Sequence, residues 1–246
     1  MDRLLYVAAS GASQLMRAQA INANNLANAG TTGFQAELIG LRSQPVFGPG
    51  FGSRVYAMTE SPGVDFSKGG FQHTGRELDV AVQGQGWIAV QAPDGTEAYT
   101  RAGNLRVTTT GLLETADGLP VLGDGGPILV PESEKIDIGA DGTVSSLPVG
   151  QDPATMAVVG RIKLVSPDPA ALRKGEDGLL RMADGSAAPP SASVRLATGM
   201  LETSNVSVVE AMMNMMELAR QFEAQVDLLK AARDNDAASA KLMQLG

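Results

Sequence analysis

Residues 206–230 read VSVVEAMMNMMELARQFEAQVDLLK, and this stretch decides what kind of fold the chain can form. It lies within residues 206–245, which contain neither glycine nor proline. Apolar side chains recur along it at steps of four and three: Val208, Met212, Met215, Ala219, Phe222, Val226 and Leu229. This heptad spacing predicts a long helix with one apolar stripe, and such a helix needs a partner because it is only marginally stable alone in water.

The opposite end of the chain carries a second helical pattern. Residues 2–28 contain no proline and a single glycine, Gly11. One seam of mostly small and apolar residues recurs there at steps of three and four: Met1, Leu5, Ala8, Ala12, Leu15, Gln19, Asn22 and Leu26. Asn28 and Gly30 then supply residues that commonly end a helix. Two such helices can pair antiparallel and still expose apolar surface, which favours a subunit of an oligomer or polymer. An ordinary helical subdomain packed on the rest of the chain is the alternative.

Asparagine is concentrated at the end of the first predicted helix. Four of the eight asparagines of the chain are Asn22, Asn24, Asn25 and Asn28. Asparagine is unfavourable inside a helix because its amide competes for backbone groups. The cluster therefore predicts amides that bond across an interface and fix its register, as a buried asparagine does in coiled coils. A frayed helix end with amides bonded to water is the alternative.

Between the two helical patterns lies a glycine-rich region of short β-prone segments. The dipeptide Asp-Gly occurs six times, with its aspartates at Asp94, Asp117, Asp124, Asp141, Asp177 and Asp184. Asp-Gly favours two-residue hairpin turns in which both residues have a positive φ angle. The β-prone segments are residues 78–82, 87–91, 105–109, 120–122, 128–130, 136–138, 158–165 and 194–198. They predict an antiparallel sandwich or an irregular barrel.

The expected fold class is therefore α+β, with N- and C-terminal helices pairing as a coiled-coil layer and a central antiparallel β-rich domain. We expect residues 1–36 and 206–246 to form one discontinuous helical domain that serves polymerisation. Residues 37–76 have weak periodicity and many glycines and prolines, so they are expected to form an extended connector. Residues 77–205 are expected to form the β-rich outer domain.

Composition excludes several functional classes. The 246 residues include no cysteine, which excludes a disulfide framework, a thiolate metal site and an iron–sulfur cluster. The formal net charge is −8 without a basic cluster, so we expect no nucleic-acid partner, because contacts to phosphates supply much of that affinity. No stretch reaches the roughly 18–20 apolar residues of a membrane helix, so direct membrane insertion is not expected. The N-terminus also does not resemble a cleavable secretory signal.

No combination of residues predicts catalysis. His73 is the only histidine, so a paired metal site is not expected. Residues 84–86 read Gly-Gln-Gly but lack the third glycine and the following helix of a dinucleotide loop. Asp94 and Asp117 could pair as in glycosidases, but both lie in predicted turns. We expect no enzyme, no cofactor and no metal ion, and we interpret the methionines of residues 212–216 as packing residues.

Three stretches resemble the signatures of bacterial flagellar axial proteins, the family of rod, hook and hook-associated subunits. Residues 22–35, NANNLANAGTTGFQ, resemble the N-terminal signature, and residues 78–87 and 99–105, LDVAVQGQGW and YTRAGNL, are similar to the opening of the family's β-domain. Residues 201–206, LETSNV, resemble the matching C-terminal signature, which continues with Glu210, Met213, Arg220, Phe222 and Glu223. The sequence departs from the family at Gln35, where lysine is frequent, and at Trp87, where phenylalanine is common.

The resemblance implies a structural subunit of the basal-body rod, the hollow drive shaft that transmits torque from motor to hook. Length and the opening MDRLLYVAASGA are most similar to the proximal rod subunits. The implied partners are this protein itself, other rod subunits and the flagellar export apparatus, through which the chain would leave without a cleaved signal to reach the periplasm-spanning rod. A distal rod or short hook-type subunit is the alternative within the family, and a β-rich extracellular binding module is the alternative outside it.

In that arrangement the terminal helices form an inner coiled-coil layer. The residues expected at the polymer interface are Leu5, Leu15, Asn22, Asn24, Asn25, Leu26, Asn28, Phe34, Asn205, Met212, Met215, Phe222, Val226 and Leu229.

Overall fold

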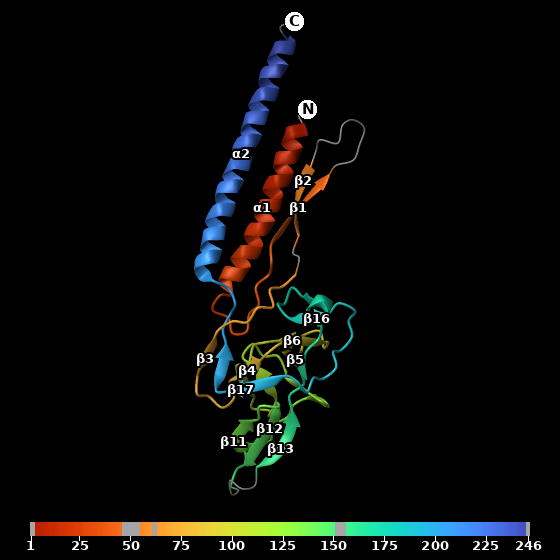
Figure 1. Cartoon of the computed structure of the whole chain (residues 1–246), viewed down its shortest axis with the longest axis vertical. Helices are drawn as coiled ribbons and strands as arrows, with labels where there is room; N and C mark the ends of the chain where they lie inside the picture. The colour runs from red at the N-terminus through yellow and green to blue at the C-terminus, as the bar shows by residue number, and fades with distance from the viewer. Residues whose placement is uncertain (1–2, 46–54, 61–62, 151–155, 245–246) are drawn as a thin grey trace. The chain divides into compact units, whose positions relative to one another are not determined.

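The structure is a computed structural model that describes residues 3–45, 55–60, 63–150 and 156–244. It confirms the α+β class, with a helix towards each end of the chain and β-strands between them (Figure 1). The chain divides into two compact units. The helical unit comprises Met1–Ala29, Glu37–Asp65 and Val206–Gly246, and the β-rich unit comprises Gly30–Ala36 and Phe66–Asn205.

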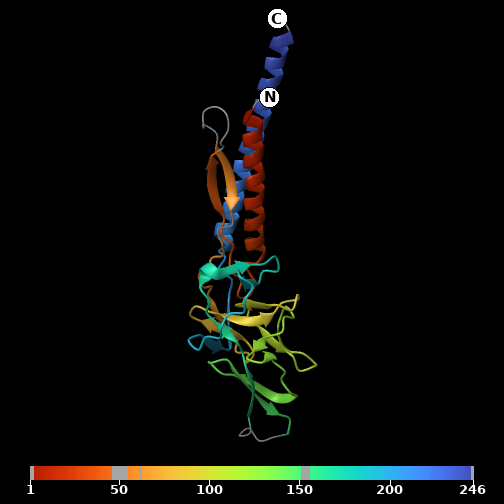
Figure 2. The ribbon, with the colours of Figure 1, turned by 90° about the vertical axis from the view of Figure 1, so that its right-hand side faces the viewer.

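The helical unit is built on α1 (Arg3–Ala27) and α2 (Val208–Gln244), close to the ranges that the sequence predicts. Met1 of the predicted seam lies outside the described residues. The two helices run antiparallel side by side in both views (Figures 1 and 2). α1 has 25 residues and α2 has 37, so α2 is longer by about 18 Å at 1.5 Å per residue. Small residues let the helices approach: a Cβ atom on Gly11 would lie 3.3 Å from the side chain of Gln225.

The side of α2 that is turned inwards overlaps the predicted stripe in most of its residues and departs from it at the N-terminal end of the helix. Its buried and half-buried residues follow steps of four and three: Ala211, Met215, Leu218, Phe222, Gln225, Leu229 and Ala232. Ala219 and Val226 of the predicted stripe are also half-buried, whereas Val208 and Met212 are 43% and 51% exposed. The inward stripe thus contains alanines at positions where a bulkier side chain would hold the helices apart.

Residues 37–76, expected as an extended connector, contain an antiparallel hairpin in the helical unit. Its strands are β1 (Gly40–Pro45) and β2 (Val55–Glu60), and Glu37 and Val64 continue the pairing as an isolated bridge. Ser207 caps the N-terminus of α2, because the N–H of Glu210 donates to Ser207 Oγ at 3.4 Å.

Every strand pair in the described part of the β-rich unit is antiparallel. The largest sheet has the order β14-β5-β6-β16-β15, a smaller one has the order β11-β12-β13, and four further pairs are β17-β4, β18-β3, β7-β8 and β10-β9. The strands are β3 (Phe71–His73), β4 (Val80–Gln83), β5 (Trp87–Gln91), β6 (Glu97–Thr100), β7 (Leu105–Val107), β8 (Leu113–Thr115), β9 (Leu122–Gly123), β10 (Gly126–Pro127), β11 (Ser133–Ile138), β12 (Thr143–Pro148), β13 (Ala157–Arg161), β14 (Leu164–Val165), β15 (Leu172–Lys174), β16 (Leu180–Met182), β17 (Arg195–Thr198) and β18 (Met200–Glu202). The expected strand at 128–130 is instead an isolated bridge between Leu112 and Leu129.

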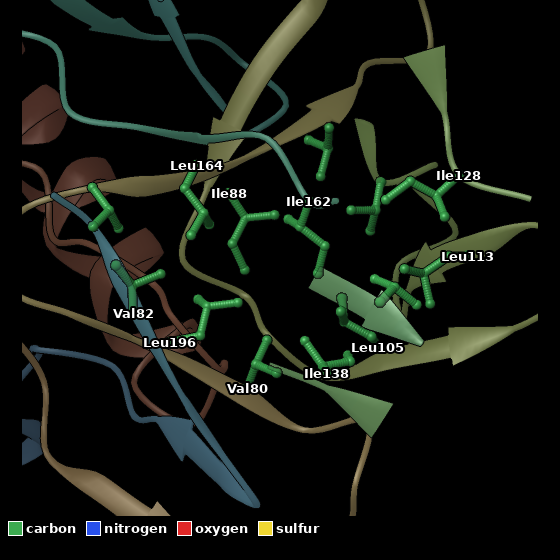
Figure 3. Packing of buried hydrophobic residues seen from close by; sticks show 14 of the residues in the cluster. Val80, Val82, Ile88, Leu105, Leu113, Ile128, Ile138, Ile162, Leu164 and Leu196 are labelled. Atoms are coloured by element: carbon green, nitrogen blue, oxygen red, sulfur yellow. The ribbon is translucent and has the colours of Figure 1, made fainter. Parts of the chain in front are cut away.

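One hydrophobic core holds these small sheets together. Branched aliphatic side chains from many strands meet in it, and Figure 3 shows their packing. The members that are at most 2% exposed are Val80, Val82, Ile88, Val90, Ala98, Leu105, Leu113, Val121, Val130, Ile138, Val144, Ile162, Val194 and Leu196. Each buried valine, leucine or isoleucine side chain stabilises the fold by about 1.5–3 kcal/mol relative to exposure. The core therefore compensates for strands that are individually too short to be stable.

Except at Asp124-Gly125, which joins β9 to β10 as a two-residue loop, the Asp-Gly turns differ from the predicted two-residue type. Among the described residues no residue other than glycine has a positive φ angle, so the aspartates do not adopt the expected conformation. Residues 92–96 show the pattern that is found instead: Gly95 N donates to Ala92 O, and Ala92 N donates to Thr96 O, both at 2.9 Å. This is a three-residue loop in which a type I turn is followed by a left-handed glycine. Residues 108–112, 115–119, 139–143 and 175–179 repeat the same two hydrogen bonds.

A buried tyrosine makes the stability of the β-rich unit depend on pH. Tyr99 is 1% exposed, its hydroxyl donates to Glu97 Oε1 at 3.0 Å and it accepts from the N–H of Ala188 at 2.6 Å. Burial raises the pKa of Tyr99 from 10.0 to about 12. The folded state therefore keeps the phenol proton at pH values at which the unfolded chain releases it.

We expect the Tyr99 contribution to be complete below pH 10 and to disappear as the pH rises towards 12, a loss on the order of 2 kcal/mol. Tyr99→Phe should be less stable at pH 8, because the Ala188 N–H loses its acceptor, and should show a shallower decline between pH 10 and 12. Urea unfolding followed by the fluorescence of Trp87, the single tryptophan, measures both values. An identical pH slope in both proteins would contradict this assignment.

Candidate functional site

The helical unit exposes an unusual amount of apolar surface. Its exposed large apolar side chains are 43–69% accessible and comprise, among the described residues, Tyr6, Met16, Leu38, Val208, Val209, Met212, Met213, Met216 and Leu228. Val209, Met212, Met213 and Met216 follow the spacing i, i+3, i+4 and i+7, which places them on one side of α2. We call these four residues the methionine stripe. It contains Met212 of the predicted interface, and it differs from the inward stripe that faces α1.

The asparagine cluster fixes backbone positions within the helical unit. Asn22 is 3% exposed and donates from Nδ2 to Ala211 O at 2.7 Å, which joins α1 to α2. Asn25 donates to Glu37 O and accepts from Glu37 N, both at 2.9 Å. Asn28 donates from Nδ2 to Asn24 O at 3.0 Å. Asn24 itself is exposed, and its predicted contact with another subunit stays a prediction.

The remaining predicted helical residues are buried or half-buried within the helical unit. Leu15 is buried, and the others are half-buried: Leu5, Leu26, Met215, Phe222, Val226 and Leu229. Their role between subunits stays a prediction.

The two remaining predicted residues, Phe34 and Asn205, meet in the β-rich unit. Asn205 N donates to Phe34 O at 3.3 Å, and Asn205 Oδ1 accepts from Ala36 N at 2.8 Å. Gly33 N donates to Glu202 O at 2.8 Å. Residues 33–36 and 202–205, from opposite ends of the sequence, therefore lie side by side. We call them, with Trp87 and Arg101, the signature cluster.

A buried ion pair lies at the centre of the signature cluster. The side chains of Arg101 and Glu202 are both 2% exposed, and Arg101 Nη1 lies 2.7 and 2.9 Å from the two Glu202 carboxylate oxygens. The rest of the guanidinium is also bonded: Nε donates to Gly86 O at 3.1 Å and Nη2 to Gly84 O at 2.7 Å. Gly69 N donates to Glu202 Oε1 at 3.2 Å. Burial of two charges is tolerable here because their hydrogen-bonding groups find partners.

A glycine allows the chain to pass this pair closely. Gly33 has a φ angle of +67°, and a Cβ atom there would lie 2.2 Å from the carbonyl carbon of Arg101. Any other residue would therefore both strain its own backbone and collide with that of Arg101.

The two departures from the family signature contact each other. Trp87 Nε1 donates to Gln35 Oε1 at 3.0 Å, and both residues are buried. Phenylalanine has no N–H and lysine has no acceptor, so this bond needs both departures together. Lys174 donates to Gln35 O at 2.9 Å, and its Nζ atom lies 4.0 Å from the centre of the Phe34 ring.

Sequence reasoning missed Arg101 and Glu202 as site residues, although both lie in the stretches that resemble the family. One signal for this pair is present in the sequence: an arginine and a glutamate, which have opposite charges, each lie within a signature of small and apolar residues. The two residues lie 101 positions apart in the sequence, so only the folded chain shows that they form one ion pair.

No catalytic group emerges from the described residues. A hollow of about 480 Å³ in the β-rich unit is lined in part by Asp141, Arg161 and Lys163, but Lys163 pairs with Glu97 at 2.8 Å and Arg161 with Asp141 at 3.9 Å. His73 is exposed in β3. Within the described ranges, no group of three or more acidic or histidine residues could hold a metal ion, and no helix is long and apolar enough to cross a bilayer.

Comparison with protein families covers both ends and the centre of the chain. Residues 5–35 match the family described as "Flagella basal body rod protein", residues 81–146 match "Flagellar hook protein FlgE/F/G D1 domain", and residues 197–242 match "Flagellar basal body rod FlgEFG protein C-terminal".

Individual relatives agree with these matches over the full length. The chain is 44% identical over 251 aligned positions to the flagellar basal-body rod protein FlgF of Salmonella typhimurium, and 42% identical over 251 positions to FlgF of Escherichia coli, with all of each chain covered. The chain is 31% identical to the flagellar basal-body rod protein FlgG of Bacillus subtilis over 247 positions, which cover 91% of this chain and 92% of that protein.

We expect Glu202→Ala to lower the free energy of unfolding by about 3–5 kcal/mol, because the charge of Arg101 stays buried without its partner. The double variant Arg101→Met with Glu202→Met should lose less, since no charge remains to be buried. Chemical unfolding followed by Trp87 fluorescence is a direct measurement, because the Arg101 guanidinium lies 5.7 Å from the centre of the Trp87 ring.

The matched control is Asp227→Ala, which removes the exposed partner of Lys230 at 3.0 Å. It should leave stability nearly unchanged, because exposed ion pairs contribute little. Equal stabilities of Glu202→Ala and Asp227→Ala would show that the buried pair does not hold the unit together.

Proposed function

The chain belongs to the flagellar basal-body rod proteins of the FlgF type, and on this basis we propose that it polymerises with further rod subunits through its helical unit. It is a structural subunit of the flagellar basal body and not an enzyme, as its sequence predicts.

The exposed methionine stripe is the observation that carries this proposal. Contiguous apolar surface on a protein in water marks a site of association. Methionine side chains are flexible and polarisable, so they adapt to a neighbour of irregular shape. In the proposed polymer α1 and α2 form a coiled-coil inner layer: the inward stripe holds the two helices of one subunit together, and the methionine stripe packs on helices of neighbouring subunits.

Three finer features complete the proposal. The subunit lies in the proximal rod, transmits torque from motor to hook, and reaches the periplasm through the flagellar export apparatus without a cleaved signal. The greater similarity to FlgF than to FlgG supports the proximal position. The signature cluster supports torque transmission, because hydrogen bonds tie residues 33–36 to residues 202–205 and a buried ion pair ties Glu202 to Arg101.

The alternatives are not favoured. A distal rod or hook-type subunit fits less well, because the match to FlgF proteins is both longer and closer than the match to FlgG of Bacillus subtilis. An extracellular binding module does not account for family matches at both ends and in the centre of the chain.

We expect Val209→Asp to abolish motility and the recovery of intact rods while the purified protein keeps its melting temperature. Val209 is 69% exposed, so the monomer buries little of it, and an aspartate in the first turn of α2 suits the helix dipole. In an apolar contact between subunits the same carboxylate would be buried without a partner. Soft-agar motility, electron microscopy of isolated basal bodies and thermal unfolding of the monomer are the three measurements.

Val158→Asp is the matched control, because Val158 is an equally exposed valine, at 70%, on strand β13 of the β-rich unit. It should leave rods and motility intact. Normal rods with Val209→Asp and defective rods with Val158→Asp would place the assembly surface on the β-rich unit and reject the methionine stripe.

A further inference from the structure

The six Asp-Gly steps of the β-rich unit differ in how the glycine nitrogen is bonded. In five of them the glycine N–H donates to a carbonyl three residues earlier, at 2.9–3.0 Å; these glycines are Gly95, Gly118, Gly142, Gly178 and Gly185. At the sixth step, Asp124-Gly125, the Gly125 N–H makes no hydrogen bond with any residue that the structure describes.

The position of each step in its turn explains the difference. Asp124 and Gly125 are the two central residues of the β9–β10 hairpin, because Gly123 pairs with Gly126 and Leu122 with Pro127. In a four-residue turn the first carbonyl accepts from the fourth N–H, and the third N–H is not used. Gly125 is third in its turn, whereas the glycines of the other five steps are fourth.

We propose that Asp124 is the site at which this chain spontaneously forms isoaspartate. The Gly125 nitrogen attacks Cγ of the protonated Asp124 carboxyl group, and the new N–Cγ bond closes a five-membered succinimide. The carboxyl hydroxyl and the amide hydrogen leave together as water. Water then reopens the ring: cleavage at Cγ restores aspartate, and cleavage at the main-chain carbonyl carbon directs the backbone through Cγ as isoaspartate. The product has the mass of the original chain, and neither oxidant nor enzyme is needed.

The surroundings of Asp124 favour ring closure there more than at the other Asp-Gly dipeptides. Asp124 and Gly125 are exposed, and a Cβ atom on Gly125 would meet nothing within 4 Å, so the ring has room to form. Hydrogen bonds from Thr96, Thr143, Arg181 and Ser186 lower the pKa of the four carboxyls of Asp94, Asp141, Asp177 and Asp184, respectively. Those groups stay ionised to lower pH, and a carboxylate is a poorer electrophile than a carboxylic acid.

The modification would lengthen the backbone of a turn that other strands depend on. Leu122 O in β9 accepts from Lys163 N at 2.8 Å, and Gly123 bridges to Ile162. An additional methylene group between β9 and β10 changes the register of this hairpin at the edge of the 480 Å³ hollow that Asp124 helps to line.

Incubation of the purified full-length chain in oxygen-18 water at neutral pH tests the assignment. Each passage through the succinimide incorporates one heavy oxygen, and tandem mass spectrometry of proteolytic peptides assigns that oxygen to an individual aspartate. Asp117 is the internal reference, because its glycine N–H is bonded to Thr115 O at 2.9 Å. We expect oxygen-18 to enter Asp124 at least about fivefold faster than Asp117, since one hydrogen bond must break before Gly118 can react.

Two variants and one solvent condition separate the turn geometry from other causes. Asp124→Glu should remove the fast label, because the six-membered ring of a glutamate closes far more slowly, while Asp117→Glu should leave the label at Asp124 unchanged. In denaturant the six steps should label at similar rates. Equal rates at Asp124 and Asp117 in the folded protein would overturn the assignment, and so would a preference for Asp124 that persists in denaturant.

Discussion

The ion pair between Arg101 and Glu202 joins segments of the β-rich unit that lie far apart in the sequence, and many of the contacts of that unit are arranged around it. A buried arginine is tolerable only if its donors are bonded, and here the side chain reaches Glu202, Gly84 and Gly86. Glu202 in turn receives the N–H of Gly69 and, through its main chain, that of Gly33. One pair of charges therefore fixes backbone segments from the beginning, the middle and the end of the chain.

The sequence predicts the elements of this fold better than their contacts. Both helices follow from long stretches without proline and nearly without glycine, and β5 begins and ends where the residues of 87–91 predict. The turns were predicted with the wrong geometry because the dipeptide Asp-Gly fits two loop types. These types differ in which carbonyl the glycine N–H reaches, a choice made by the paired strands and not by the two residues themselves.

The candidate site was predictable on the helices and not in the β-rich unit. The heptad pattern locates α2 and most of its half-buried residues, but it misses Ala211 and Ala232, because alanines carry little hydrophobic signal and yet these two are the most buried of the side chains described on that helix. The bond between Gln35 and Trp87 and the pair of Arg101 and Glu202 join distant positions, and periodicity contains no information about such pairs.

The sheet order also affects how the chain can fold in time. Strand β17 pairs with β4 and β18 with β3, so the last strands of the sequence complete sheets begun by the first strands of this unit. The chain must lose the conformational entropy of closing such long loops before those contacts can stabilise it. A fold dominated by non-local pairs therefore forms slowly. A ribosome synthesises the chain from its N-terminus, and β4 has no β17 until more than a hundred further residues have been added. During synthesis the β-rich unit is consequently an incomplete fold with open strand edges, and its closure awaits the segment that immediately precedes α2.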